Sequence, residues 1–434
     1  MISLADKIGN KSAIIGIIGM GYVGLPLALA FTEAGFKVTG IDIQQKRVNL
    51  VNRGCSFITG ISDKRLKEPV KAGKLKATTD QGELKEADAI LICVPTPLTK
   101  TKDPDLSYVI SEANQIAKYM RPAQLIVLES TTYPGTTSQV VLPILLGSGH
   151  KLDKDFYLAY SPEKVDPGND KYGIKNTPKL VGGVTNMSTE MAVLLYSQVA
   201  KKIVPVASPE VAEMAKVFEN VFRSVNIALV NELAQLCEKF HVSVWDVIDA
   251  AATKPFGFMP FYPGPGIGGH CIPLDPYYLA NKARELDFHT RFIQLAAEIN
   301  EDMPYYVATR IMEELSQQGK SLKGAKVLVL GAAYKKDVND SRESQSIKLM
   351  QILASRGAVV HYNDPLLPVI KFMGSDITSV DLSNKNIASF DCLIIATAHS
   401  CYDFNKIARH SRLLFDTRGV TRDIRSRNIV RLGE

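Results

Sequence analysis

Short, almost wholly apolar runs alternate with segments of helical periodicity in the first 205 residues. The run at 13–18 leads into a glycine turn and then into LPLALAFTEAG, where Gly35 marks a helix end. Further runs with the length and composition of buried strands follow at 36–41, 89–94, 125–128 and 156–160. Strands that alternate with helices predict a parallel, doubly wound sheet.

From Pro209 the pattern changes to about 30 residues with apolar positions at helical spacing. This segment contains no Gly or Pro after its start, so we expect one long helix that bridges two lobes. A helical region continues through VWDVIDAA and a Gly/Pro-rich loop to about residue 315.

Strand-like runs resume at 326–330, 359–363, 392–397 and 413–416. They predict a second α/β sheet, although GxGxxG is replaced by GAAYKKDVNDSRES after its first strand. The predicted fold class is therefore α/β, with two Rossmann-like doubly wound domains joined by a long central helix and a helical middle domain. The expected boundaries are 1–205 for cofactor binding, 206–315 for the helical domain and 316–434 for the second sheet, with a ligand cleft between the two sheets.

The composition is that of a soluble globular protein, with 46% hydrophobic and 22% charged residues. The net charge of +6 suits an anionic small molecule, and we expect no nucleic-acid partner because basic runs with interleaved aromatics are missing. Six scattered cysteines without CxxC predict free thiols in a reducing compartment. With no secretory signal and no apolar run of about 18 residues, we expect a cytoplasmic protein that does not bind membranes.

The glycine turn follows a strand, opens a helix and is followed by an acidic residue after the next strand. Gly19 permits the tight turn, Gly21 admits a pyrophosphate and Gly24 lets helix and strand pack closely. Asp42 is positioned for a ribose 2′-hydroxyl and favours NAD over NADP, although the nearby Arg47 weakens the argument against NADP. A glycine turn without a ligand is the alternative.

The segment YPGPGIGGHCIPLDP contains a thiol within a loop that no ordinary helix or strand tolerates. Most free cysteines are small buried hydrophobes, as we expect of Cys93 and Cys392. The glycines before Cys271 and the carboxylate at Asp275 instead indicate close approach to a ligand. His270 adjoins the thiol in sequence, which favours a structural role for it over a Cys/His pair.

Polar residues also occur on the long helix and after strands. Lys216 and Asn220 lie four residues apart on one helix face, which is either solvated surface or the wall of a cleft. Three strands end in polar segments at 95–97, 129–135 and 161–163, and the carboxyl ends of parallel strands share one edge. These segments predict a site at that edge. A separate expectation concerns metals: the sequence contains no zinc-ligand spacing, so we expect no metal.

Together these segments resemble the UDP-glucose/GDP-mannose dehydrogenase family over essentially the whole chain. The matching segments, in the family's order, are GMGYVGLPLA, VPTPLTK, ESTTYPGTT, SPEKVDPG, EMAKVFENVFRSVNIALVNELA, GPGIGGHCIPLDPYYL and AYKKDVNDSRES. GGHCIPLDP and SPEKVDPG look most like the bacterial branch that oxidises UDP-N-acetylglucosamine at C6. The resemblance suggests capsule or O-antigen precursor synthesis.

The resemblance implies a four-electron oxidation of a sugar CH2OH to a carboxylate with two NAD. Cys271 would hold the intermediate aldehyde as a thiohemiacetal and then as a thioester. UDP-N-acetylglucosamine is the expected substrate, with UDP-glucose, UDP-GalNAc and UDP-ManNAc as alternatives. The long helix implies a homodimer or larger assembly.

The resemblance also assigns roles to individual residues. The implied catalytic residues are Cys271, Lys216, Asp275, Asn220, Glu163 and Thr132. The implied NAD-binding residues are Gly19, Met20, Gly21, Tyr22, Val23, Gly24, Asp42, Arg47, Thr96, Thr132 and Arg342. The implied substrate-binding residues are Glu163, Lys164, Val165, Lys216, Asn220, Tyr262, Gly264, Gly266, Gly268, Lys335 and Arg418.

Two other functions fit parts of the sequence. A two-electron dehydrogenase of the 3-hydroxyacid or 6-phosphogluconate type shares a Rossmann domain followed by helices, but needs neither a thiol nor a third domain. An NAD-sensing scaffold without chemistry is disfavoured by the presence of Cys271, Lys216 and Asp275.

Overall fold

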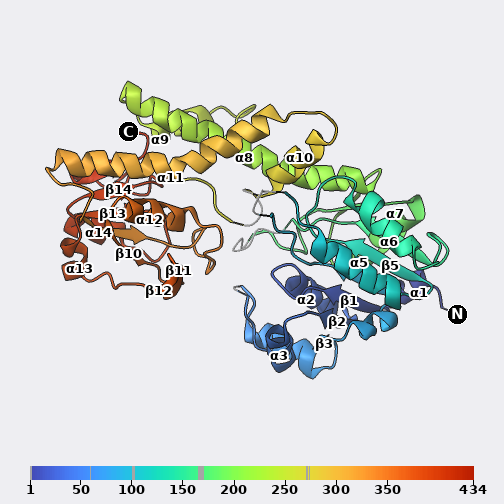
Figure 1. Cartoon of the computed structure of the whole chain (residues 1–434). Coiled ribbons are helices and arrows are strands. Elements are labelled where there is room, and N and C mark those ends of the chain that lie inside the picture. Colours follow the sequence, from blue (N-terminus) through green and yellow to red (C-terminus); the bar gives the residue numbers. More distant parts are fainter. Residues whose placement is uncertain (1, 59, 100–102, 165–170, 270–271, 273) are drawn as a thin grey trace. The chain divides into compact units, whose positions relative to one another are not determined.

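The computed structural model describes residues 2–58, 60–99, 103–164, 171–269, 272 and 274–434 (Figure 1). The chain forms two compact units, Met1–Glu219 with Tyr277–Phe288 and Asn220–Pro276 with His289–Glu434. The predicted division into three domains with boundaries at 205 and 315 stays a prediction.

An eight-stranded sheet forms the centre of the first unit. Its strands, in spatial order, are β3 (Leu75–Thr78), β2 (Lys37–Ile41), β1 (Ile14–Ile18), β4 (Ala89–Ile92), β5 (Gln124–Leu128), β6 (Phe156–Tyr160), β7 (Lys179–Gly183) and β8 (Ile203–Pro205). The pairs from β3 to β6 are parallel, whereas β7 runs antiparallel to β6 and parallel to β8. The predicted parallel sheet is therefore correct for its central strands.

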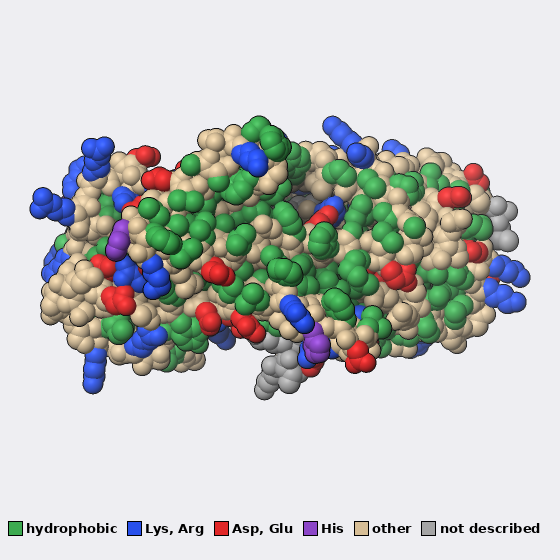
Figure 2. Space-filling view, turned by 90° about the horizontal axis from the view of Figure 1, so that it is seen from above, with side chains coloured by type: hydrophobic (Ala, Val, Ile, Leu, Met, Phe, Trp, Pro, Cys, Tyr) green, Lys and Arg blue, Asp and Glu red, His purple; other side chains and the backbone are tan. Residues whose placement is uncertain are grey.

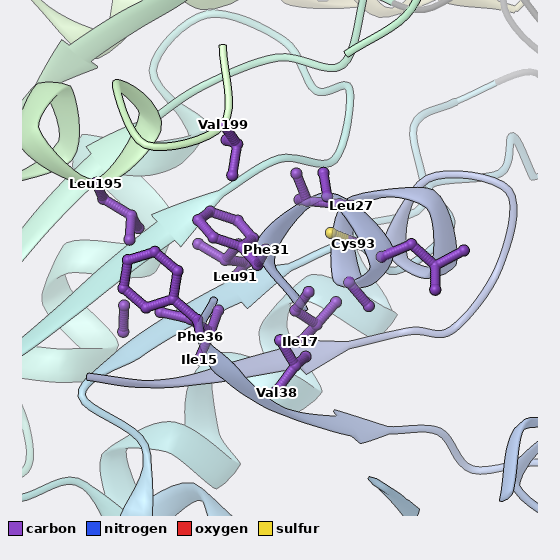
Figure 3. Close-up of a cluster of buried hydrophobic side chains, with 14 of the residues drawn as sticks. Ile15, Ile17, Leu27, Phe31, Phe36, Val38, Leu91, Cys93, Leu195 and Val199 are labelled. Atoms are coloured by element: carbon purple, nitrogen blue, oxygen red, sulfur yellow. The ribbon is translucent and has the colours of Figure 1, made fainter. Parts of the chain in front are cut away.

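Helices cover both faces of this sheet because alternate strand residues point to opposite sides. Ile15 and Ile17 face one hydrophobic cluster with Phe31 and Leu195, which Figure 3 shows in close-up, and Ile18 faces the other cluster. The helices of the unit are α1 (Leu4–Gly9), α2 (Gly24–Ala34), α3 (Gln45–Arg53), α4 (Asp63–Lys71), α5 (Ser107–Tyr119), α6 (Leu142–Leu146) and α7 (Asn186–Tyr196), with short turns of other helical types at Gln81–Glu86 and Thr136–Val141. The doubly wound class is confirmed.

The second unit contains a five-stranded parallel sheet. Its strands, in spatial order, are β10 (Val359–Asn363), β9 (Lys326–Leu330), β13 (Cys392–Ile395), β14 (Leu414–Asp416) and β15 (Ile429–Arg431), and β11 (Val369–Phe372) and β12 (Ser375–Thr378) form a separate hairpin. The helices α11 (Arg291–Gln317) and α12 (Gln345–Ser355) pack on one face, and α13 (Asn384–Ser389) and α14 (Phe404–His410) pack on the other. The expected second Rossmann-like sheet is thus present.

The long helix expected after Pro209 is α8 (Pro209–Phe240), which begins in the first unit and continues in the second. The helices α9 (Val244–Ala252) and α10 (Asp275–Arg284) follow it in the chain. In the part of the chain that the structure describes, helices long enough to cross a membrane are not apolar enough to do so. The described cysteines Cys55, Cys93, Cys237, Cys392 and Cys401 are all free thiols.

Candidate active site

The turn after β1 leaves room for a ligand at one glycine and none at the other two. Gly19 has φ +91°, and a Cβ on it would lie 2.6 Å from the carbonyl oxygen of Cys93. A Cβ on Gly24 would lie 1.9 Å from the carbonyl oxygen of Gly19, so only glycine lets α2 approach β1. A Cβ on Gly21 would meet nothing within 4 Å. Gly21 therefore borders the open space that a pyrophosphate needs at the N-terminus of α2.

Asp42 follows β2 and is 5% exposed. Its carboxylate accepts hydrogen bonds from the backbone N–H groups of Met20 (2.9 Å) and Gln44 (2.8 Å), and the Arg47 guanidinium lies 3.5 Å away. These bonds fix the carboxylate beside the glycine turn, as binding of a ribose diol requires. The Met20 side chain packs in the core against Gly40, so only its backbone remains available to a cofactor.

The segments after β4 and β5 are joined by hydrogen bonds. The Thr96 hydroxyl donates to the carbonyl of Thr131 (2.7 Å), and Ser130 Oγ donates to the carbonyl of Val94 (2.7 Å). The phenol of Tyr278 donates to the carbonyl of Thr96. Thr132 is fully buried, and its hydroxyl has no hydrogen-bond partner among the described residues. An unsatisfied buried hydroxyl is unfavourable, so this position fits a ligand group that bonds to it.

Together, the Gly21 opening, the Asp42 carboxylate and the Thr132 hydroxyl fit NAD. An anion-binding turn, a ribose acceptor and a buried polar atom lie on the first unit, and all follow parallel strands of its sheet. Of the three polar strand ends expected to form a site, those after β4 and β5 are joined by the hydrogen bonds of Thr96 and Ser130, and the expected site at this edge stays a prediction.

Glu213 of α8 is a site residue that the sequence did not single out. It is fully buried and accepts hydrogen bonds from Gly135 N (2.6 Å), Thr137 N (2.9 Å) and Thr137 Oγ1 (2.7 Å). Burial raises its pKa to about 7, although these hydrogen bonds oppose the shift. Glu213 holds the loop after β5 against α8.

A buried ion pair lies below the same edge. Lys179 Nζ contacts Glu129 Oε2 at 2.7 Å and the carbonyl of Pro162 at 3.4 Å, and the phenol of Tyr196 donates to Glu129. Burial raises the pKa of Glu129, against the effect of Lys179. The pair links the segment that precedes Thr132 to the one that precedes Glu163. In a sequence, such a pair is indicated only by a polar residue within an apolar strand. Lys179 is the first residue of β7, so it gives no such indication.

Three predicted substrate or catalytic residues also belong to the first unit. The Lys164 ammonium forms an ion pair with Glu219 at 2.5 Å, and Glu163 accepts a hydrogen bond from the backbone N–H of Lys164 (2.8 Å). Lys216 is 9% exposed on α8, so of the two alternatives for this position the solvated surface does not apply. Val165 lies outside the described residues.

In the second unit, Asn220 and Asp275 are brought together. Both side chains are buried, and the Asn220 amide donates a hydrogen bond to the Asp275 carboxylate. Asp275 is the first residue of α10. Cys271, the predicted nucleophile, and His270 lie outside the described residues.

The glycines that precede Cys271 pack against residues of the second unit. A Cβ on Gly264 would lie 2.5 Å from Arg418 Nη1, and one on Gly268 would lie 3.0 Å from Tyr334 Cβ. Gly266 has φ +103°, and its Cβ would lie 2.9 Å from the carbonyl oxygen of Asn300. The prediction of a ligand-facing backbone at these glycines stays a prediction; the atoms nearest to the added Cβ positions belong to the Arg418 side chain and to the carbonyls of Asn300 and Glu343. Of these, Arg418 is a predicted substrate residue.

Buried amides anchor the start of this loop. Asn231 Oδ1 accepts from Gly264 N (3.0 Å), and Asn231 Nδ2 donates to Asn300 Oδ1 (2.9 Å). Tyr262 stacks on Trp245 at 6.0 Å between ring centroids, and its phenol donates to Asp249 (2.7 Å). Asn231 and Asn300 were not predicted, although each is a polar residue at a buried helix position.

The predicted cations of the second sheet differ in their surroundings. Arg342 is paired with the Asp340 carboxylate at 2.7 Å, and Lys335 is half-buried in the same loop. Arg418 Nε donates to the carbonyl of Ala396 (2.7 Å). Desolvation lowers the Arg418 pKa to about 10, against the effect of Asp416, so its guanidinium stays charged at neutral pH. Within the described residues, no cluster of His, Cys, Asp and Glu suited to a metal ion is found.

Comparison with known proteins agrees with this arrangement. Residues 13–200 match the NAD binding domain of the UDP-glucose/GDP-mannose dehydrogenase family, residues 210–302 its central domain, and residues 328–423 its UDP binding domain. Protein CapL of Staphylococcus aureus is 35% identical over 416 residues, which cover 94% of this chain and 96% of CapL. The UDP-N-acetyl-D-glucosamine 6-dehydrogenase of Salmonella typhi is 32% identical over 414 residues, which cover 94% of this chain and 96% of that protein.

Among solved structures, the UDP-D-ManNAc dehydrogenase of Pyrococcus horikoshii superposes with a TM-score of 0.88 and 33% identity, covering 97% of this chain and 99% of that one. The expectations of NAD as cofactor and of an NAD-dependent UDP-sugar 6-dehydrogenase are confirmed. The domains of one family match in order along nearly the whole chain, which therefore belongs to the UDP-glucose/GDP-mannose dehydrogenase family.

Proposed function

We propose that this enzyme oxidises the C6 hydroxymethyl group of a UDP-N-acetylhexosamine to the carboxylate in two steps. UDP-N-acetylglucosamine is the proposed substrate because GGHCIPLDP and SPEKVDPG resemble that branch of the family. Relatives named for UDP-N-acetylglucosamine and for UDP-N-acetyl-D-mannosamine share the acetamido group, which supports an N-acetylated sugar. The product suits a bacterial polysaccharide precursor.

The chain's own residues supply the covalent chemistry. NAD, when bound, accepts the hydride in each oxidation. We propose that the Cys271 thiolate adds to the C6 aldehyde and so retains it between the two oxidations. After the second oxidation C6 is a thioester, and water releases the carboxylate and regenerates the thiol. A two-electron dehydrogenase needs no such thiol.

The observation that carries this proposal is the buried hydrogen bond between Asn220 and Asp275. It fixes an amide beside a carboxylate that lies four residues after Cys271 in the sequence, and this hydrogen bond offsets the cost of burying both groups. We propose that Asn220 and Lys216 stabilise the oxyanion, where one fixed donor contributes about 3–4 kcal/mol. Asp275, with Glu163 and Thr132, would orient water.

For the remaining predicted residues we retain the roles implied by the family. Gly19–Gly24, Asp42, Arg47, Thr96 and Arg342 are proposed to bind NAD. The UDP-sugar is proposed to contact Lys164, Val165, Tyr262, Gly264, Gly266, Gly268, Lys335 and Arg418. The half-buried charge of Arg418 suits a diphosphate.

A substrate comparison tests the sugar assignment. We expect the highest kcat/KM with UDP-N-acetylglucosamine, and a value at least about tenfold lower with UDP-glucose, which lacks the acetamido group. UDP-ManNAc and UDP-GalNAc test the stereochemistry at C2 and C4. Equal kcat/KM for UDP-glucose and UDP-N-acetylglucosamine would contradict the N-acetyl assignment, and a maximum with UDP-ManNAc would contradict the gluco assignment.

We also propose that the enzyme is a homodimer that pairs through α8. Leu229, Leu236 and Phe240 are 61%, 49% and 69% exposed, and their spacing of seven and four residues puts them on one helix face. Figure 2 shows hydrophobic side chains gathered on the face that carries α8 and α9. Exposed apolar surface gathered on one face is typical of a protein interface.

A further inference from the structure

His399 follows β13 at the carboxyl edge of the second sheet and is fully buried. Its Nε2 lies 3.0 Å from Asp364 Oδ2, and its Nδ1 accepts a hydrogen bond from the backbone N–H of Asp337 (3.0 Å). Because Nδ1 accepts, the ring proton belongs on Nε2, where it is donated to Asp364. The hydrogen bonds therefore specify one neutral tautomer of His399.

Asp364 is a fixed acceptor for that proton. It also accepts from the backbone N–H groups of Ala332 (2.8 Å) and Ala333 (2.9 Å). Burial opposes its charge, but the hydrogen bonds from His399 and Ala333 outweigh burial and hold the pKa of Asp364 below its usual range. His399 is thereby anchored from the strand side.

On its other side, His399 holds the loop that carries Lys335. Asp337 lies two residues after Lys335 and has φ +59°, a conformation that is unfavourable for a residue with a side chain. Its carboxylate accepts from Ser400 N (2.8 Å) and Ser400 Oγ (2.6 Å). His399 thus hydrogen-bonds to the backbone of Asp337, and Ser400 hydrogen-bonds to its side chain.

The same loop contacts the segment before Cys271. Tyr334 precedes Lys335, and its backbone N–H donates to the carbonyl of Asp340 (2.9 Å). The Tyr334 ring is the nearest neighbour of a Cβ placed on Gly269, at 3.0 Å. A shift of the loop at Asp337 would therefore displace residues both before and after Lys335.

We propose that His399 is a positioning residue for UDP-sugar binding, which acts through Asp337 to set the loop that bears Lys335. This inference rests on the proposed contact of Lys335 with the UDP-sugar. The competing interpretation is a core histidine whose hydrogen bonds serve stability alone. The two interpretations differ in whether loss of the Nδ1 acceptor weakens UDP binding or lowers stability alone.

Two substitutions separate the ring nitrogens. In His399→Asn the amide oxygen is attached at Cγ, as Nδ1 is, and retains an acceptor for Asp337 N. In His399→Gln the amide reaches Asp364 in place of Nε2 but leaves the Asp337 N–H without its acceptor. We expect His399→Gln to weaken UDP binding and to raise the KM for the UDP-sugar about tenfold. For His399→Asn we expect both values within about twofold of the wild-type values.

The experiment measures UDP binding by calorimetry, KM for the UDP-sugar, NAD affinity and melting temperature on the full-length variants. NAD affinity should stay unchanged in both, and both should melt at similarly lowered temperatures. Equal UDP affinity in His399→Gln and the wild type would overturn the proposal, as would equal losses in the Asn and Gln variants. Ser400→Ala, which leaves the buried ring intact, should weaken UDP binding in the same direction if His399→Gln does not fold.

Lys335→Met distinguishes this inference from the proposed function. If Lys335→Met weakens UDP binding and His399→Gln does not, only the role of His399 is wrong. If neither variant weakens it, the assignment of Lys335 to UDP-sugar binding is wrong as well.

Discussion

Glu213 couples α8 to the loop after β5, and its proton makes that coupling dependent on pH. Its pKa rises from the ordinary 4.5 to about 7 on burial, so between these values the folded protein holds a proton that the unfolded chain releases. The stability that this proton supplies is fully present below pH 4.5 and is lost as the pH rises through 7.

We therefore expect the free energy of unfolding of the wild type, relative to Glu213→Gln, to fall by on the order of 3 kcal/mol between pH 4.5 and 7.5. Urea denaturation at several pH values measures this difference. Glu210→Gln is the matched control on the same helix, because a hydrogen bond from Ser138 holds the pKa of Glu210 below its usual range although burial opposes it. Its difference should not fall with pH, and a flat profile for Glu213→Gln would contradict the account.

Individual site residues differ in how far the sequence could predict them. Asp42 was predictable because a carboxylate after the second strand of a glycine-turn unit has one common role. Asp364 occupies the matching place after β10, yet its partner His399 is 35 residues away and only the fold brings them together. Glu213 was not predictable because the three hydrogen bonds that its carboxylate accepts come from one loop 76 to 78 residues earlier in the chain.

At the scale of elements, apolar runs identified the central strands and the edge strand β10, but not the edge strands β3, β8 and β15 or the buried strand β7. β1, β4, β5 and β13 have interiors buried on both faces and were expected at nearly their observed positions. β8 and β15 are only half-buried, and the antiparallel direction of β7 depends on pairing that no local pattern reports. Burial on both faces helped but did not decide alone, because half-buried β10 was expected at its observed bounds and buried β7 was not expected.

The proposed dimer is a property of α8. Leu229→Glu puts a charge at its most exposed leucine, so we expect it to shift the protein from dimer to monomer at micromolar concentration, as measured by light scattering after size exclusion. Leu146→Glu on α6, also at an exposed leucine, should leave the assembly unchanged. A Leu229→Glu protein with wild-type mass would rule out this face as the interface.

At the scale of the whole molecule, one chain combines an NAD cradle on one sheet with a UDP binding domain on another. Each unit has its own hydrophobic clusters, so each sheet presents its strand ends on a scaffold with its own core. The Cys271 loop lies between these two domains in the sequence. A thiol that retains the aldehyde, as we propose for Cys271, would give such a dehydrogenase a use for all three parts.

The ratio of NADH formed to UDP-sugar consumed tests this account most directly. We predict two NADH per UDP-sugar for the wild-type enzyme, with the uronic acid as product. Cys271→Ser should form no acid while it still binds NAD. A firm ratio of one, or acid formation by Cys271→Ser at the wild-type rate, would contradict the covalent four-electron mechanism.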